Sequence, residues 1–360
     1  MQIGIIGLPN STKTTIFGAL TRQAVQTQPF STGKFETQRA VVDVPDPRVD
    51  RLAEMFQPRK VTRAQVQYND IAGLDAGVGQ SGGFSGALLN AIAVNDALLH
   101  VVRAFRDDAI PHIRGSVDPA RDLRDLDAEL ILADLSMVEH RMERLQRDLK
   151  RPGPAADLAA EEQTLLLRLK DALEAEVPLR DLSLTEAEQQ RLRGFSFLTL
   201  KPVLVVLNVG DDGPLDPSVL VSYVHRHSEV IALRGGIERD IAQMDEASAG
   251  MFLSEYGIGE PSLRRLIRLS YDLLGVQSFF TVGEDEVRAW TMQRGGTAVD
   301  AAGTIHTDLA RGFIRAEVVG YDNLVEAGSL AEARLRGLLR LEGRDYVVKD
   351  GDVMEIRFNI

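Results

Sequence analysis

The sequence contains no cysteine and only six histidines, and these two shortages exclude several kinds of chemistry. Without cysteine there is no disulfide bond, no thiol catalysis and no thiolate metal site, which fits a protein of the reducing cytoplasm. The histidines are scattered along the chain and show no zinc-binding spacing. We therefore expect a cytoplasmic protein without a zinc or disulfide framework.

Long apolar runs and an excess of positive charge are also missing. No apolar stretch approaches the length of a membrane span, and no basic segment precedes an apolar one near the first residue. Neither membrane insertion nor secretion is expected. The formal net charge of −12 argues against indiscriminate nucleic-acid binding, so no specific DNA binding is predicted and RNA contact requires a local basic patch.

The 360 residues are enough for two or three domains, and apolar patterning predicts an interrupted α/β domain. Residues 1–122 and 195–276 alternate predicted strands and helices with glycine-rich loops, as in a wound parallel sheet. The predicted strands are Ile3–Ile6, a stretch ending at Asp70, Ala97–Val102, Val203–Leu207 and Glu229–Ala232.

Residues 123–194 interrupt this α/β pattern with amphipathic helices. Apolar residues recur at spacings of three and four, with a one-residue phase slip after Met137, which predicts a coiled-coil-like helical hairpin. The segment Pro152-Gly153-Pro154 separates the two long helices, and Thr185 with Glu188 predicts a capping box for a third, shorter helix. A basic stripe near the tip of this arm is a candidate RNA contact, although a solvated helix face is the alternative; it consists of Arg141, Arg144, Arg147 and Arg151.

Residues 278–360 predict a small mixed α+β domain. Its expected strands are Phe279–Val282, Phe313–Val319, Tyr346–Val348 and Val353–Phe358, with a turn at residues 349–352. Ten basic residues stand against fourteen acidic ones here, a poor balance for RNA binding, so we place any RNA contact on the helical arm.

The first fifteen residues carry the strongest chemical signal. A short apolar strand runs into a loop that opens at Gly7 and ends at Lys13-Thr14-Thr15, and an apolar helical pattern follows. This is the context of a Walker A motif, in which Lys13 reaches the β- and γ-phosphates and Thr14 ligates Mg²⁺. The motif requires glycine at position 12, where the Cβ of Thr12 crowds a backbone that approaches phosphate closely. Taken alone, this segment fits a plain strand–turn–helix about equally well.

Two further motifs follow predicted strands in the order found in P-loop GTPases. Asp70-Ile71-Ala72-Gly73 matches D-x-x-G, in which the Asp holds the Mg²⁺ shell through water and the Gly amide senses the γ-phosphate. Leu74 follows where Ras-type enzymes carry a water-positioning Gln, so hydrolysis must use another group or be slow. Asn208-Val209-Gly210-Asp211 takes the place of the guanine-reading N-K-x-D, with Val209 instead of Lys.

Longer strings make the chain resemble the YchF subfamily of Obg-related P-loop NTPases nearly from end to end. Prominent among them are Gly7-Leu8-Pro9-Asn10, Val44-Pro45-Asp46-Pro47-Arg48, Leu198-Thr199-Leu200-Lys201-Pro202-Val203 and Glu286-Val287-Arg288-Ala289-Trp290-Thr291. The resemblance implies a G domain, an inserted helical arm and a C-terminal TGS domain of β-grasp type. It also implies ribosome association and Mg²⁺-dependent hydrolysis of ATP, as well as or in preference to GTP.

Roles carry over from this resemblance where the residues match. The phosphate loop comprises Asn10, Ser11, Thr12, Lys13, Thr14 and Thr15, and the metal shell comprises Thr14, Thr32 and Asp70. Asn208 and Val209 fit the base-contacting segment. His112 resembles a family histidine that stands in for the missing Gln, and a solvent-exposed loop histidine is the alternative interpretation.

Four nucleotide-site segments depart from the family pattern. Thr12 replaces glycine, Asp211 replaces Glu, Arg234-Gly235-Gly236 replaces a Ser-Ala-Lys-like loop, and residues 33–36 replace I-E-P-N. These departures predict weakened or altered binding. The leading hypothesis is a slow ATPase or GTPase that switches conformation at the ribosome. The alternative is a degenerate scaffold that binds ribosomes or protein partners and hydrolyses little.

The base preference is left open between two expectations. The carboxylate of Asp211 favours guanine, because it accepts hydrogen bonds from guanine N1–H and N2–H₂. The absence of the bracing lysine at Val209, together with the resemblance, favours adenine read through backbone groups. We lean to ATP with residual GTP binding.

Overall fold

The computed structural model describes residues 1–21, 37–71, 84–149, 154–255 and 259–359. Its contacts divide the chain into a first unit, residues 1–40 with 67–266, and a second unit, residues 41–66 with 267–360. The sequence places 41–66 in the G domain, whereas these residues pack with the C-terminal ones. The cause is long-range pairing, because Lys60 pairs with Glu286 and Arg48 binds Asp350.

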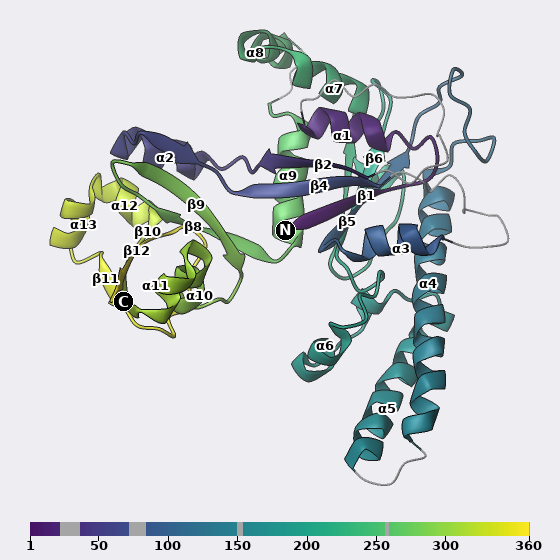
Figure 1. Cartoon of the computed structure of the whole chain (residues 1–360). Coiled ribbons are helices and arrows are strands. Elements are labelled where there is room, and N and C mark those ends of the chain that lie inside the picture. The colour runs from purple at the N-terminus through teal and green to yellow at the C-terminus, as the bar shows by residue number, and fades with distance from the viewer. Residues whose placement is uncertain (22–36, 72–83, 150–153, 256–258, 360) are drawn as a thin grey trace. The chain divides into compact units, whose positions relative to one another are not determined.

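A six-stranded sheet forms the base of the first unit, in the order β2-β4-β1-β5-β6-β7 (Figure 1). In this order, each pair of neighbouring strands from β4 to β7 is parallel. The strands are β1 (Gln2–Ile6), β2 (Thr37–Asp43), β4 (Gln65–Ile71), β5 (Ala97–Arg103), β6 (Val203–Asn208) and β7 (Ser228–Leu233). The five strands predicted for this domain are confirmed, with ends that differ by at most one residue. Parallel strands bring the loops after their carboxyl ends to one edge of the sheet, where open α/β sheets bind ligands.

Helices cover both faces of this sheet. Helix α1 (Lys13–Thr21) packs against α7 (Gly235–Gln243), and both lie on the face opposite α3 (Gly86–Ala93) in Figure 1. Helices α8 (Glu246–Glu255) and α9 (Ser262–Leu273) follow α7 along the chain. On the other face, Leu88 and Ile92 of α3 share a core with apolar residues of β1, β5 and β6.

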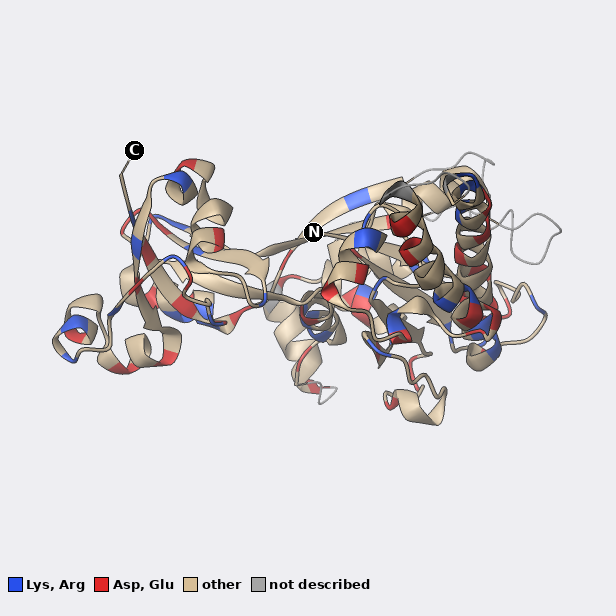
Figure 2. Ribbon diagram, turned by 90° about the horizontal axis from the view of Figure 1, so that it is seen from below, with Lys and Arg blue, Asp and Glu red and all other residues tan. Residues whose placement is uncertain are grey.

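The predicted helical hairpin is confirmed as α4 (Pro119–Asp148) and α5 (Pro154–Glu174), which lie side by side (Figure 1). Leu126 and Leu130 of α4 belong to the core under the sheet, whereas Val138 and Leu145 pack with α5. The apolar stripe therefore changes partner between Leu130 and Val138, which accounts for the phase slip in the sequence. Basic and acidic residues are interspersed along α4 and α5, and Figure 2 shows both kinds of charge mixed over the structure.

Shorter elements complete the first unit. The capping box is confirmed at α6 (Glu186–Leu192), where Thr185 N–H donates to Glu188 and Glu188 N–H donates to the Thr185 hydroxyl. Among the described residues of this unit, two 3₁₀ turns, η2 (Leu179–Asp181) and η3 (Pro217–Val219), lie in the connecting segments. No helix in the described ranges combines the length and apolar composition needed to span a bilayer.

The second unit contains its own six-stranded sheet, in the order β11-β10-β12-β8-β9-β3. Its strands are β3 (Lys60–Thr62), β8 (Val276–Thr281), β9 (Glu286–Gln293), β10 (Phe313–Gly320), β11 (Arg340–Glu342) and β12 (Asp352–Phe358). Its helices are α2 (Pro47–Phe56), α10 (Ala298–Ile305), α11 (Thr307–Arg311), α12 (Tyr321–Ala327) and α13 (Leu330–Leu335). Phe279, Phe313 and Val318 form the centre of its core with the alanines of α10.

One predicted strand of this unit is wrong. Tyr346–Val348 forms no strand and makes only an isolated bridge between Val347 and Thr297. The Asp352 carboxylate accepts from the Tyr346 hydroxyl and from Lys349 N–H, at 2.8 and 2.9 Å, and this folds the segment back on itself. The predicted turn at residues 349–352 is confirmed, with Gly351 at a φ of 90°.

Candidate nucleotide site

The loop between β1 and α1 encloses its own lysine. Gly7 lies so close to β5 that a Cβ there would come within 2.3 Å of the carbonyl oxygen of Val101, so only glycine fits. The Nζ of Lys13 donates to the carbonyl oxygens of Gly7 and Leu8, at 2.9 and 3.0 Å. The ammonium is thereby held inside the loop, at the start of α1, where a phosphate-binding lysine is needed.

Two residues of this loop adopt a left-handed backbone that favours glycine. Asn10 has a φ of 59°, which asparagine tolerates, and Thr12 has a φ of 70°, which strains a β-branched residue. The Thr12 hydroxyl donates to the carbonyl oxygen of Ser11 and accepts from Asn208 Nδ2. The glycine expected at position 12 is thus needed for its dihedral freedom, and the threonine is held by a bond from β6.

Asp70, near the end of β4, meets Thr14 on α1. The Thr14 hydroxyl donates to Asp70 Oδ2 at 3.3 Å. Burial raises the pKa of the Asp70 carboxyl, while the charge of Lys13 and the bond from Thr14 oppose that rise. Asp70 Oδ1 and the Ser11 hydroxyl are both buried, and neither has a hydrogen-bond partner among the described residues.

These oxygens fit Mg²⁺. Magnesium is held in proteins by one or two carboxylates together with substrate phosphates and water, rather than by a full cage of side chains. One carboxylate and one hydroxyl beside a phosphate loop match that donor set. Thr32, the third predicted ligand, and Gly73 lie outside the described residues.

The predicted base-contacting residues lie after β6 and beside the start of α7. Both polar atoms of the Asn208 side-chain amide are hydrogen-bonded. Oδ1 accepts from Gly235 N–H at 2.8 Å, and Nδ2 donates to the Thr12 hydroxyl at 2.5 Å. Val209 is 2% exposed and belongs to the core. Its N–H donates to the carbonyl oxygen of Leu233 at 2.9 Å, so its carbonyl oxygen is the group left for a base. Asp211 is exposed, and a Cβ on Gly236 would lie 3.2 Å from its carboxylate.

His112 lies in the loop that follows β5, and the alternative interpretation as a solvent-exposed loop histidine is wrong. Its side chain is 4% exposed, and Nε2 pairs with Asp122 of α4 at 2.7 Å. Nδ1 accepts from the backbone N–H of Arg114 at 3.1 Å. The preceding residue, Pro111, accepts from Asn10 Nδ2 at 3.3 Å, so this loop borders the phosphate loop.

Two polar residues near the site were not predicted from the sequence. His100 of β5 is fully buried, and burial together with the charges of Lys13 and Arg180 lowers its pKa to about 3. Its one signal in the sequence is a histidine inside an apolar strand. Asp122 is one of several acidic residues in the first turns of α4, and nothing in the sequence distinguishes it from Asp125, which pairs with Arg114.

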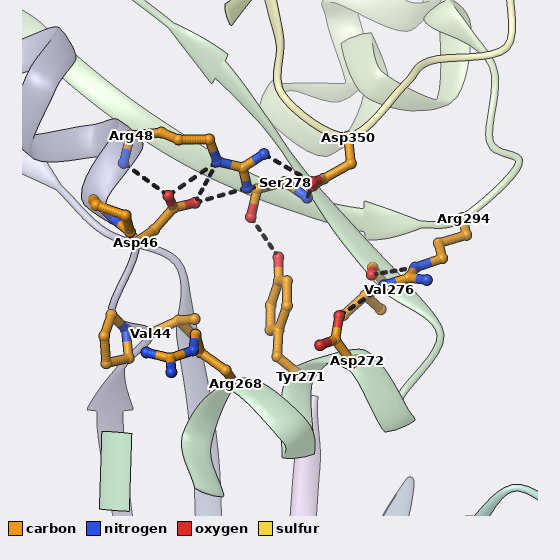
Figure 3. A pocket seen from close by; sticks show the side chains of 12 residues that line it. Val44, Asp46, Arg48, Arg268, Tyr271, Asp272, Val276, Ser278, Arg294 and Asp350 are labelled. Carbon is orange, nitrogen blue, oxygen red and sulfur yellow. Dashed lines mark hydrogen bonds and ion pairs between the residues drawn. The ribbon is translucent and has the colours of Figure 1, made fainter. Parts of the chain in front are cut away.

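A separate cavity of about 140 Å³ lies within the second unit (Figure 3). Arg48 binds Asp46 at 2.9 Å and Asp350 at 2.7 Å, and Asp350 also accepts from Ser278 N–H. Arg294 pairs with Asp272 at 2.7 Å on the same wall. Because these charges neutralise one another, the cavity lacks the unmatched positive charge that a phosphate site needs. The Arg48–Asp350 ion pair in its wall joins residues 41–66 to the C-terminal part of the unit.

A parallel sheet with a phosphate loop after its first strand, and an aspartate near the end of the neighbouring strand, defines a P-loop NTPase. Two family models match the chain. Residues 2–134 match the 50S ribosome-binding GTPase model, and residues 276–359 match the YchF-GTPase C-terminal model, which is described as a protein of unknown function.

Full-length relatives narrow the class. The chain is 41% identical over 367 residues to the ribosome-binding ATPase YchF of Bacillus subtilis, covering all of both chains. It is 33% identical over 367 residues to the Obg-like ATPase 1 of Caenorhabditis elegans, covering 100% of this chain and 92% of the relative. The chain belongs to the YchF family. The solved structure of the Schizosaccharomyces pombe YchF GTPase matches with a TM-score of 0.87 and 29% identity, over 99% of this chain and 97% of that one.

Proposed function

We propose that the protein is a ribosome-associated P-loop NTPase that binds Mg²⁺–ATP, with residual GTP binding, and hydrolyses it slowly as a conformational switch. The observation that carries the proposal is the pair of buried oxygens, Ser11 Oγ and Asp70 Oδ1, that lack partners among the described residues. Buried polar atoms are almost always hydrogen-bonded, so two such atoms beside Lys13 favour a site that a ligand completes.

Phosphate binding is assigned to Asn10, Ser11, Thr12, Lys13, Thr14 and Thr15, with the amide of Gly73 next to the γ-phosphate. Lys13 supplies the positive charge, and the N-terminus of α1, which begins at Lys13, adds the positive end of the helix dipole. Thr14, Thr32 and Asp70 would hold Mg²⁺, which neutralises charge on the β- and γ-phosphates when bound. A buried carboxylate whose pKa is raised by burial gains most from such a cation.

Base selection is assigned to Asn208, Val209 and Asp211. The Asn208 amide joins the phosphate loop to the start of α7 and fixes both against β6. Val209 offers only its carbonyl oxygen, because its side chain is buried and its N–H is bonded to Leu233, and an exposed carboxylate such as Asp211 is weakly held without a bracing lysine. Backbone contacts therefore dominate, which favours adenine without excluding guanine.

Hydrolysis is assigned to His112 as the group that positions the attacking water. Its loop borders the phosphate loop through the bond from Asn10 to Pro111. Slow turnover fits a histidine with both ring nitrogens already bonded, to Asp122 and to Arg114 N–H. It also fits Leu74, an aliphatic residue in the place of a water-orienting glutamine.

Ribosome association is proposed because several full-length relatives carry the name ribosome-binding ATPase. The RNA contact is assigned to the helical arm, through Arg141, Arg144, Arg147 and Arg151. Arg141 is bound by Glu162 at 2.6 Å, while Arg144 and Arg147 are exposed; Arg151 lies outside the described residues. The C-terminal residues 278–360 are assigned to a TGS-like domain.

The strained Thr12 favours one alternative, a scaffold that binds nucleotide weakly. Competition of ATP and GTP for one fluorescent nucleotide at millimolar Mg²⁺ separates the two. We expect saturable ATP binding, with GTP weaker by less than about tenfold, or 1.4 kcal/mol. The scaffold predicts no saturation. The adenine preference is wrong if GTP wins by more than about tenfold and Asp211→Ala abolishes that advantage.

A further inference from the structure

We propose that Asp122 is a positioning residue that withholds His112 from the phosphate site, so that hydrolysis requires release of the imidazole from helix α4. The inference rests on the proposed role of His112. It adds a residue on a different element, and it explains the slow turnover through a defined contact.

The contact uses the whole imidazole ring. Asp122 Oδ2 lies 2.7 Å from Nε2, and both side chains are 4% exposed. This bond makes Nε2 the protonated nitrogen, and the lone pair of Nδ1 is occupied by Arg114 N–H at 3.1 Å. A histidine that orients water needs a free ring nitrogen within hydrogen-bond reach of that water. In this arrangement neither nitrogen is free.

The loop is fixed to α4 at further points. Arg114 pairs with Asp125 at 2.9 Å, and the Arg121 guanidinium donates to the hydroxyl and carbonyl oxygens of Ser116. Arg121 also binds the second oxygen of Asp122 at 2.7 Å. The carboxylate is thus held from two sides, which fixes the place where it captures His112.

The other end of the loop is held next to the nucleotide. The buried Arg103 donates to the carbonyl oxygens of Phe105, Asp107 and Ile110. Pro111 then accepts from Asn10 in the phosphate loop. His112 therefore follows directly after a residue that contacts the phosphate loop, and its side chain turns to α4.

Helix α4 connects this contact to the arm. Leu123 and Leu126 of its first turns pack in the core under the sheet, and Val138 and Leu145 pack in the arm. A continuous helix shared by two cores transmits small displacements between them as a rigid element. A shift of α4 moves Asp122 relative to Pro111, the residue before His112, which is held at the phosphate loop.

The test compares the full-length wild type with Asp122→Ala, Asp122→Asn, His112→Ala and the double variant His112→Ala/Asp122→Ala. If release limits hydrolysis, Asp122→Ala raises kcat for ATP by about fivefold or more without changing KM, because a larger fraction of molecules is competent. The gain disappears in the double variant. Asp125→Ala, which breaks the neighbouring Arg114 pair but leaves the bond from Asp122 to His112, gives a smaller rise in kcat than Asp122→Ala.

Modification of His112 by diethylpyrocarbonate, followed by peptide mass spectrometry, reports its release directly. We expect protection in the wild type and reaction in Asp122→Ala, with the exposed His306 as internal reference. If Asp122→Ala does not fold, the near-isosteric Asp122→Asn replaces it, with a smaller rise in both readouts.

The outcomes separate the two proposals. A kcat that stays equal or falls in a folded Asp122 variant, while His112→Ala lowers kcat, overturns the restraint but leaves the role of His112 intact. If His112→Ala has no effect on turnover, the proposed role of His112 itself is wrong.

Discussion

The phosphate loop of the first unit and the Arg48 cluster of the second contain the same kinds of charged group, but they use them differently. In the Arg48 cluster, one guanidinium binds two carboxylates, and Asp350 takes a further N–H from Ser278. Burial opposes ionisation of Asp350, yet the bonds from Arg48 and Ser278 outweigh burial and lower its pKa. The ion pairs are complete within the unit.

Around the phosphate loop, by contrast, the buried polar groups are not all paired among the described residues. Asp70 keeps a buried oxygen without a partner among the described residues, and its pKa is raised by burial rather than lowered. Thr12 holds a left-handed backbone. Such strain and unpaired polarity destabilise a fold unless a ligand relieves them, and they are typical of functional sites. The comparison therefore predicts that substitutions in the loop change binding and those in the Arg48 cluster change stability.

Asp70→Asn tests the loop and is expected to have the largest effect. Loss of the carboxylate should weaken nucleotide binding at millimolar Mg²⁺ by about a hundredfold, or 2.7 kcal/mol. The thermal midpoint should stay equal or rise, because a buried, incompletely bonded carboxylate is replaced by a neutral group. Titration without Mg²⁺ is the control, in which wild type and variant should bind alike. If the variant keeps the Mg²⁺-dependent affinity of the wild type for nucleotide, Asp70 does not contribute to the metal site.

Arg48→Ala tests the other region. Removal of a guanidinium that is 26% exposed leaves two carboxylates unpaired, and should destabilise the second unit by about 2 kcal/mol. The only tryptophan, Trp290 on β9, lies in this unit, so its fluorescence in a denaturant titration reports the effect. Nucleotide affinity should not change.

The matched control is Arg59→Ala in the same unit. Arg59 and Asp285 are 85% and 88% exposed, and such a pair contributes little to stability. If Arg48→Ala and Arg59→Ala lower the free energy of unfolding equally, the ion pairs of Arg48 stabilise the unit no more than an exposed ion pair does.

Thr12→Gly is expected to have the smallest effect. Relief of the left-handed strain should tighten nucleotide binding by about tenfold, or 1.4 kcal/mol, even though the bond from Asn208 is lost. Thr12→Ala is the control, since it loses the same bond but keeps the Cβ, and should give no gain. If alanine tightens binding as much as glycine, the bond to Asn208 rather than the backbone limits affinity.

Features set by neighbouring residues were predictable. The strand before the phosphate loop, the capping box at Thr185 and the turn at Gly351 each depend on side chains a few positions apart. The strand predicted at Tyr346–Val348 failed because its backbone pairs over a single bridge, in which Ala298 N–H donates to the Tyr346 carbonyl oxygen and Val348 N–H donates to the Gly296 carbonyl oxygen. Local apolar content was sufficient for a strand, but the partner residue, Thr297, is the N-cap of α10 and not part of a strand.

The sequence by itself determined the phosphate loop, five strands of the first sheet, the amphipathic arm and the family, because these follow from short-range spacing and from strings of residues. Tertiary structure alone decided that residues 41–66 pack with the C-terminal unit, that Asn208 binds Thr12, and that Asp122 holds His112. The Asn208 and Arg48 bonds join residues 196 and 302 positions apart. Such contacts form only when the sheets bring distant segments together, and no local pattern specifies which of many charged residues will meet.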